Sequence, residues 1–431
     1  MGLRDLAVDT TPLRRVRSFR VITASYSMSS IGSRLTDVAI PVQIYALTRS
    51  PLAIGLLGLA VLPARLGLSV FGGALADRGE RRHIMLVCEA AGALCSVGLL
   101  ANAMLDRPHL LVIYVLALLS SAAHSLSVPA HRSTIPLVMP PELLTSAFAL
   151  QAVVGSVSWL VGPAIFGLCG GNVRVAFAID VVSYLLSFAY LTRLEPVGIV
   201  GDHSEQTTLG AVAEGLRSLR GNAPVMGAIA MDLNAMIFGL PTALIPAVVV
   251  QRFHGASYAY SLLYAGPFLG TLVASASSGW SVRIRRHGWA ITLSVMAWGA
   301  AIVGFGIARS LVLSVLCLAL AGAADMVSGV FRMAVHANAT PPELLGRMEG
   351  ASMAVWAGGP ALGDLEAGGV ARLTSVNTSI WAGGVACIVT AGLLITVLRG
   401  FRTYVRPLLP GEIAPPTAGA TAREASDPPS P

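Results

Sequence analysis

Long apolar stretches alternate along the chain with short polar segments that are rich in arginine. A helix needs about 20 apolar residues to cross the hydrocarbon core of a bilayer. Twelve stretches meet this length, and each predicts a membrane-spanning helix: 20–46, 52–76, 83–105, 109–130, 146–169, 174–194, 224–250, 258–281, 288–308, 310–333, 349–371 and 378–399. The pattern therefore predicts an all-α membrane protein with twelve transmembrane helices.

The longest internal polar segment divides these stretches into two groups of six. We expect a cytoplasmic N-terminus, two six-helix bundles joined by a cytoplasmic linker, and a largely disordered cytoplasmic tail: 1–19, 20–194, 195–223, 224–399 and 400–431. Within the linker, apolar residues at helical spacing predict an amphipathic surface helix, with a solvated linker as the alternative: Leu209, Val212, Leu216 and Leu219.

Composition supports the membrane assignment and gives the orientation. The chain is 55% hydrophobic and 12% charged, whereas soluble domains carry about 25% charged residues. All of the 29 basic residues are arginines, and few of them fall in the loops that follow odd-numbered spans: Arg49, Arg107, Arg174, Arg252, Arg309 and Arg372. The positive-inside rule then places both termini in the cytoplasm. The net charge of +7 reflects this topology and does not indicate nucleic-acid binding.

An internal repeat supports the division into two halves. Pro140-Pro141-Glu142-Leu143-Leu144 recurs as Pro341-Pro342-Glu343-Leu344-Leu345, and Gly162-Pro163-Ala164 recurs as Gly359-Pro360-Ala361. Parallel repeats related by an axis along the membrane normal are typical of one class of secondary transporter.

A short charged loop between the second and third spans carries the strongest motif. It contains Gly73, Asp77, Arg78, Arg81 and Arg82. A carboxylate at a helix end can pair with nearby arginines and with the positive end of a neighbouring helix. We therefore interpret the loop as a gating latch between helices that move.

The spans, the repeat and this loop together resemble the major facilitator superfamily. Its loop pattern is Gly-x-x-x-Asp-Arg-x-Gly-Arg-Arg, and Glu80 stands where the second glycine is expected. The fifth span resembles the helix motif of exporters in this superfamily, through Ser158, Gly162, Pro163 and Gly167, although Ser158 replaces a glycine.

Two longer strings are similar to the enterobactin-exporter-like group, also called transmembrane secretion effectors. They are Val42-Gln43-Ile44-Tyr45-Ala46-Leu47-Thr48-Arg49-Ser50-Pro51 and Gly322-Ala323-Ala324-Asp325-Met326-Val327-Ser328-Gly329-Val330-Phe331-Arg332. The resemblance implies outward transport of a siderophore or a similar metabolite, driven by protons, through a cavity lined by spans one, four, seven and ten.

Polar residues inside those four spans are candidates for the substrate and proton pathway, since ionisable groups are costly in a bilayer. They are Arg34, Asp37, His124, Asp232, Asn234, Asp325 and Arg332. Arg34 and Asp37 lie one turn apart and can pair, either as a pair that breaks during transport or as a permanent structural pair. His124 is either a proton relay or a satisfied polar contact.

Asp232 has no basic neighbour one turn away on its own helix. We predict that it carries the coupled proton, with a bond to another helix as the alternative. Arg332 shares a helix face with Asp325 and is expected to extend its charge towards the cytoplasmic interface. Glu89 and Asp180 are expected to be explained by solvation or packing, and Asp364 and Glu366 to lie beside the charged loop. Arg65 has no firm interpretation.

Several functions are excluded by missing motifs. The chain has no phosphate-cradling G-x-x-x-x-G-K-[ST] loop and no His, Cys or Glu cluster at metal-ligand spacing. We therefore expect neither an enzyme nor a cofactor or metal. The leading hypothesis is a monomeric proton antiporter in the cell membrane that exports a small organic molecule. A nutrient importer on the same fold and a non-transporting sensor or scaffold are the alternatives.

Overall fold

A computed structural model describes residues 9–78, 80–196, 221–239, 242–341 and 345–406. Within these ranges the regular elements are helices, and no strand occurs. The predicted surface helix of the linker and the predicted disordered tail beyond Arg406 lie outside the described residues.

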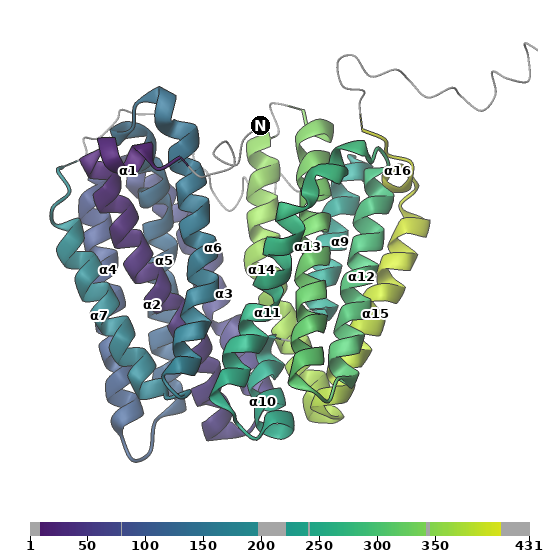
Figure 1. Cartoon of the computed structure of the whole chain (residues 1–431), viewed down its shortest axis with the longest axis horizontal. Coiled ribbons are helices and arrows are strands. Elements are labelled where there is room, and N and C mark those ends of the chain that lie inside the picture. The colour runs from purple at the N-terminus through teal and green to yellow at the C-terminus, as the bar shows by residue number, and fades with distance from the viewer. Residues whose placement is uncertain (1–8, 79, 197–220, 240–241, 342–344, 407–431) are drawn as a thin grey trace, which may run out of the picture.

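The first six predicted spans each coincide with one long helix. The elements in this half are α1 (Thr11–Arg15), α2 (Arg17–Thr48), α3 (Pro51–Arg78), α4 (Arg81–Met104), α5 (Leu110–Val138), η2 (Pro141–Leu143), α6 (Leu144–Leu168) and α7 (Val173–Leu191). Figure 1 shows α2 to α7 gathered in one bundle.

The second bundle follows the linker. Its elements are α9 (Ala223–Phe238), η3 (Thr242–Leu244), α10 (Ile245–Phe253), α11 (Ser257–Ala276), η4 (Ser278–Arg283), α12 (His287–Ile307), α13 (Leu311–Ala339), α14 (Leu345–Leu373), α15 (Val376–Val397) and α16 (Arg399–Arg402).

Ten helical stretches in the described residues are long and apolar enough to cross a membrane. The two remaining long helices, α2 and α14, correspond to the first and eleventh predicted spans. Both carry ionisable residues inside the predicted span, which lowers their mean hydropathy: Arg34 and Asp37 in α2, Asp364 and Glu366 in α14.

The seventh span is broken, where the sequence predicted one continuous helix over 224–250. α9 ends at Phe238, Gly239 is not helical, and η3 begins at Thr242. The indole of Trp298 donates to the carbonyl oxygen of Gly239 at 2.7 Å. On the other side of the break, Asp364 of α14 accepts from the backbone nitrogen of Ala243 at 2.9 Å. Polar groups released by the break are therefore satisfied inside the protein, as a bilayer requires.

This contact corrects the expected position of Asp364. The carboxylate also accepts from the hydroxyl of Thr242 at 2.5 Å, so it holds the break in the seventh span. It does not lie beside the charged loop, because that loop follows the far end of α3, whereas the backbone of Asp364 packs against Gly55 near the start of α3.

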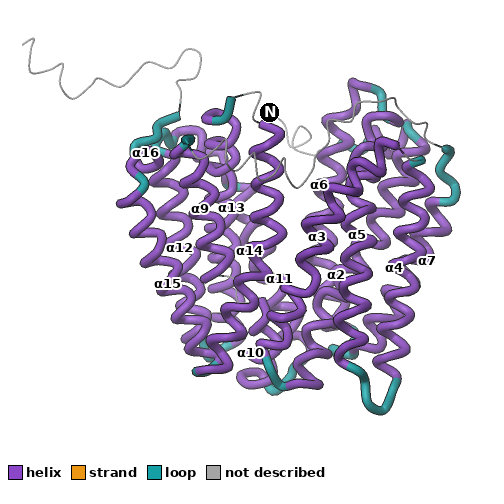
Figure 2. The backbone as a smooth tube through the Cα atoms, turned by 180° about the vertical axis from the view of Figure 1, so that it is seen from behind, coloured by secondary structure: helices purple, strands orange, loops and turns teal. Residues whose placement is uncertain are grey.

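The two bundles touch along one half of their length. α3 packs on α14, and α6 packs on α11. From the middle of the helices to the end opposite α1 and α16, the contacts run from Trp159–Phe268 to Phe166–Tyr260. Towards the end that carries α1 and α16 the ribbons of the bundles diverge (Figures 1 and 2).

The repeated Gly-Pro motif marks the same close approach in both bundles. A methyl group added at Gly162 of α6 would lie 2.5 Å from Cβ of Arg34 on α2. In the second bundle, a methyl group added at the equivalent Gly359 of α14 would lie 2.6 Å from the sulfur of Met236 on α9. Small residues thus let the fifth and eleventh helices lie directly against the first and seventh.

The rest of the exporter-type motif packs on the same helix and on the opposite bundle. Ser158 is buried and donates to the carbonyl of Val154 in its own helix at 2.8 Å. Ser261 of α11 donates to the carbonyl of Pro163 at 2.5 Å, and its side chain leaves no room for a methyl group at Gly167. The motif therefore contributes to contact between the bundles.

The charged motif is mostly helical, where the sequence predicted a loop. Gly73, Asp77 and Arg78 belong to the last turns of α3, and their side chains lie outside the described part. Arg81 and Arg82 open α4. Arg81 donates to the hydroxyl of Ser133 on α5 at 3.0 Å, and Arg82 to the carbonyl of Thr192 after α7 at 3.0 Å. These two hydrogen bonds stay within the first bundle.

Candidate functional site

A buried charge cluster joins the seventh and tenth helices. Nη2 of Arg332 on α13 lies 3.1 Å from Oδ1 of Asp232 on α9, and the two side chains are 8% and 9% exposed. The same nitrogen donates to Oδ1 of Asp325 at 3.3 Å, and the side chain of Asp325 is 49% exposed. Nη1 donates to the hydroxyl of Ser328 at 2.8 Å. One guanidinium thus contacts two carboxylates, of which one is buried and the other is half exposed.

This cluster corrects two expectations. Arg332 does not extend towards the interface, because its side chain is buried and engaged in three directions. Asp232 is not isolated, because its partner comes from another helix. The approach of Arg332 to Asp232 is a close ion pair that lacks hydrogen-bond geometry, since Oδ1 of Asp232 has no hydrogen-bond donor.

Asn234 lies apart from this cluster. Its side-chain nitrogen donates to the carbonyl of Cys387 on α15 at 3.0 Å, and the residue is 4% exposed. It therefore ties the seventh helix to the twelfth, away from Asp232, and the structure does not bring it together with the other candidates.

The first helix carries the predicted pair of Arg34 and Asp37. The two side chains meet at 2.7 Å and are 21% and 45% exposed, which confirms the pairing. The guanidinium also lies 3.8 Å from the ring centre of Trp159 on α6. Trp159 in turn stacks on Phe268 of α11 with ring centres 4.8 Å apart. A cation and two aromatic rings thus connect the first bundle to the second.

Arg65 and His124 lie on facing helices of the first bundle. Nε of Arg65 on α3 donates to the hydroxyl of Ser121 on α5 at 3.3 Å. His124, one turn further along α5, lines a small polar cavity together with Glu89. Arg65, which the sequence left without an interpretation, thus bonds α3 to α5.

A polar seam inside the first bundle was not predicted from the sequence. Hydroxyl groups along one face of α2 bond to α4 and α7, in the pairs Ser25–Ser187, Ser29–Glu89, Ser33–Tyr184 and Thr36–Asp180. Asp180 also accepts from Ser96 of α4 at 2.7 Å. Glu89 and Asp180 are 4% and 2% exposed, so packing explains their position and solvation does not. The four-residue spacing of Ser25, Ser29 and Ser33 places them on one helix face and was the available signal.

No metal centre is evident in the described ranges, where groups of three or more His, Cys, Asp or Glu residues suited to an ion are absent. The five cysteines are free and mostly buried, consistent with small packing residues. The candidate chemistry therefore consists of carboxylates, imidazoles and arginines that can exchange protons or bind a polar solute.

Comparison with known proteins assigns the family. Residues 8–406 match the family described as transmembrane secretion effector. The chain is 29% identical to the enterobactin exporter EntS of Shigella boydii over 410 residues, covering 94% of this chain and 97% of that protein. It is 28% identical to EntS of Citrobacter koseri over 413 residues, covering 94% and 98%.

Solved structures share the fold. A mutant of the nucleoside transporter NupG has a TM-score of 0.72 at 14% identity, covering 89% of this chain and 99% of that chain. A bacterial homologue of the human lysosomal transporter Spinster, in an inward-facing and unoccupied conformation, has a TM-score of 0.67 at 15% identity, covering 91% and 98%. These structures confirm the expected all-α fold. The matching family and the named relatives are transporters, not enzymes. The chain belongs to the transmembrane secretion effector family of major facilitator transporters.

Proposed function

We propose that this protein exports a siderophore-like small molecule across the cell membrane in exchange for protons, by alternating access. Its curated relatives are named enterobactin exporters, and they match nearly the whole chain. Export of enterobactin or of a similar siderophore is therefore the activity that the comparisons favour. The protein acts as a monomer in the inner membrane, with both termini in the cytoplasm.

The arrangement of the bundles supports alternating access. With the termini in the cytoplasm, the bundles diverge on the cytoplasmic side and meet on the external side. This is the state in which an exporter receives its cargo. Arg34, Asp37 and Asp325 have side chains that are 21%, 45% and 49% exposed. They offer charge of both signs to a polar solute in the space between the bundles.

The observation that carries the proposal of proton coupling is the cluster of Arg332 with Asp232 and Asp325. If all three groups are ionised, the cluster holds one positive and two negative charges. A net charge buried among helices is costly, and one bound proton removes it. Protonation of Asp232 leaves Arg332 to pair with Asp325 alone, which loosens the contact between α9 and α13.

This loosening links proton binding to the seventh helix. α9 ends at Phe238, where the span is already broken. α14 packs on α9 at Gly363 and also contacts α3 of the other bundle. A shift of α9 relative to α13 therefore reaches the surface on which the bundles touch. In this mechanism Asp232 is the proton carrier and Arg332 is the switch.

Transport in inside-out membrane vesicles tests the proposal. Vesicles that contain the protein should accumulate labelled enterobactin when their interior is made acidic, and a protonophore should abolish the accumulation. Vesicles without the protein are the control. If accumulation is the same with and without the pH gradient, proton antiport is contradicted. If the protein causes no accumulation of enterobactin at all, the substrate class is contradicted.

A further inference from the structure

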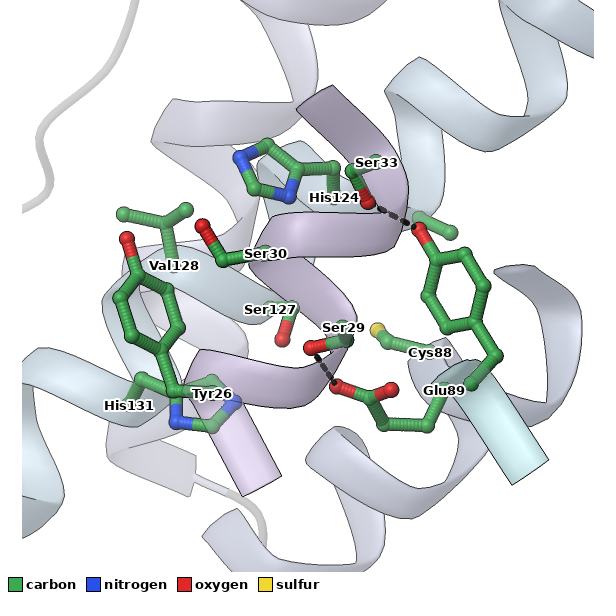
Figure 3. A pocket seen from close by; sticks show the side chains of 12 residues that line it. Tyr26, Ser29, Ser30, Ser33, Cys88, Glu89, His124, Ser127, Val128 and His131 are labelled. Carbon is green, nitrogen blue, oxygen red and sulfur yellow. Dashed lines mark hydrogen bonds between the residues drawn. The ribbon is translucent and has the colours of Figure 1, made fainter. Parts of the chain in front are cut away.

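A small polar cavity lies inside the first bundle, away from the Arg332 cluster. It is enclosed by α2, α4, α5 and α7 (Figure 3). Its volume is about 20 Å³, and about 10–15 Å³ is enough for one water molecule. The residues that matter for its chemistry are Tyr26, Ser29, Glu89, His124, Ser127 and His131.

Glu89 lines this cavity and carries one carboxyl oxygen without a hydrogen-bond partner. Its side chain is 4% exposed. The hydroxyl of Ser29 donates to Oε1 at 3.0 Å, whereas Oε2 has no hydrogen-bond partner. Within the described residues Glu89 forms no ion pair. An ionised carboxylate is costly in such a place, so the cavity accepts the neutral acid with its hydrogen on Oε2.

The opposite side of the cavity offers a proton acceptor. His131 is 6% exposed, and its Nδ1 atom has no hydrogen-bond partner. Figure 3 shows the carboxyl group of Glu89 next to Ser29, with Ser127 and the ring of His131 along the same space. A water molecule in the cavity would find several polar neighbours, which is the condition for an ordered buried water.

We propose that Glu89 is a proton-binding site in the first bundle, which exchanges its proton through a water molecule in this cavity with His131. In the exchange the O–H bond at Oε2 breaks and its electron pair stays on the carboxylate. The water takes this proton and gives one of its own to Nδ1 of His131. The resulting imidazolium and the hydroxyl of Ser29 then stabilise the ionised Glu89. As far as transport is concerned, this inference rests on the proposed proton antiport.

The groups around Glu89 favour a proton over a metal cation. Imidazoles take up and release protons near neutral pH, and an ionised Asp180 nearby would oppose a second permanent negative charge. Asp180 is itself held by hydroxyl groups from α2 and α4. The titratable groups that face Glu89 from the packed helices are Tyr26 of α2, Cys88 of α4, His124 and His131 of α5, and Asp180 and Tyr184 of α7.

Infrared difference spectroscopy on the full chain in lipid nanodiscs tests this site without any substrate. The wild-type protein should show a carboxylic-acid band that is absent from Glu89→Gln, shifts in heavy water and titrates between about pH 5 and pH 8. Ser29→Ala should keep the band but move it to higher frequency, because Oε1 loses its hydrogen bond. Glu142→Gln, at an exposed position on η2, is the control and should leave the band unchanged.

The outcomes separate the alternatives. A band that neither exchanges in heavy water nor titrates overturns the proposal, because the proton would be a fixed structural one. Loss of the band on adding sodium at constant pH also overturns it, since the cavity would then hold a cation. If Glu89→Gln does not fold, the shift caused by Ser29→Ala still assigns the band, and no shift contradicts the assignment.

A transport measurement then asks whether the site takes part in coupling. In inside-out vesicles, Glu89→Gln should reduce pH-driven accumulation of enterobactin to the level without a gradient, while exchange of labelled for unlabelled enterobactin continues. Full pH-driven accumulation by this variant overturns a role in coupling. If the wild-type protein transports no enterobactin, the proposed function fails, whereas the spectrum still decides whether Glu89 exchanges a proton.

Discussion

Arg332 of α13 and Asp232 of α9 form a buried ion pair at 3.1 Å between two helices that are far apart in the sequence. The guanidinium also reaches Asp325, which is half exposed. This arrangement places one cation between a carboxylate in the protein interior and a carboxylate that is half exposed.

The first prediction concerns the stability of this pair. Removing one partner of a buried pair leaves an uncompensated charge, so Arg332→Met should lower the free energy of unfolding by about 3 kcal/mol. Adding Asp232→Leu should restore most of the loss, since an apolar pair of similar volume needs no charge compensation. Denaturant unfolding in detergent micelles measures both variants. Equal stability of Arg332→Met and wild type would show that the pair is not buried in the membrane-embedded protein.

A second prediction concerns the aromatic contact between the bundles. Trp159→Leu removes both the stacking on Phe268 and the cation–π contact with Arg34, which together are worth about 1 to 2 kcal/mol. The ends of the bundles opposite α1 and α16 should then separate more often. Spin labels at Arg107→Cys and Arg309→Cys, in a chain without other cysteines, should report an added population at longer distance.

A matched tryptophan provides the control for that experiment. Trp289→Leu lies on α12, whose main packing partners are α9, α13 and α15 of its own bundle. It should leave the distance distribution unchanged. An unchanged distribution in Trp159→Leu as well would mean that the aromatic contact does not hold these ends of the bundles together.

A third prediction concerns the close approach of α6 to α2. In Gly162→Ala the new methyl group meets the backbone of Leu35 at 2.9 Å, and we expect a loss of about 1 to 3 kcal/mol of stability. Gly155→Ala on the same helix is the control, because no atom lies within 4 Å of the added methyl group. Both changes gain the same helix propensity, so their difference isolates packing. Comparable thermal unfolding of the two variants would contradict the packing argument.

The fourth prediction is the topology on which the transport direction depends. The arginine distribution predicts that a reporter fused after Arg406 is cytoplasmic and that one inserted between Arg107 and His109 is external. A pair of reporters, one active only inside and one active only outside the cell, measures this directly. A cytoplasmic signal at the second site would rule out twelve spans with internal termini.

Much of the fold could be predicted because a bilayer fixes helix length and requires satisfied backbone groups. The helices follow from apolar stretches, and the Gly-Pro repeat marks equivalent packing positions in both halves. The break in the seventh span was missed, although Gly239 and Pro241 in the sequence are residues that often interrupt helices. The hydrogen bonds that Asp364 and Trp298 form with the backbone beside this break are tertiary contacts, and no local sequence pattern predicts them.

The candidate site was predictable only in part. The Arg34–Asp37 pair follows from a spacing of one turn along a single helix. The partner of Asp232 could not be derived in this way, because it depends on how α9 and α13 are rotated against each other. For Glu89 the sequence suggested only solvation or packing, although serines at four-residue intervals on the first helix indicated a polar seam. Ionisable residues that pair across helices are therefore the part of such a site that sequence spacing underdetermines.

The central claim is that Asp232 carries the coupled proton and Arg332 responds to its loss. The most direct measurement is enterobactin transport by Asp232→Asn in inside-out vesicles, with and without an imposed pH gradient. The amide keeps the size of the side chain but cannot ionise. We predict that the variant loses accumulation driven by an acidic interior, while it still exchanges labelled for unlabelled enterobactin. Accumulation of enterobactin against its gradient by Asp232→Asn, driven by pH, would contradict the account.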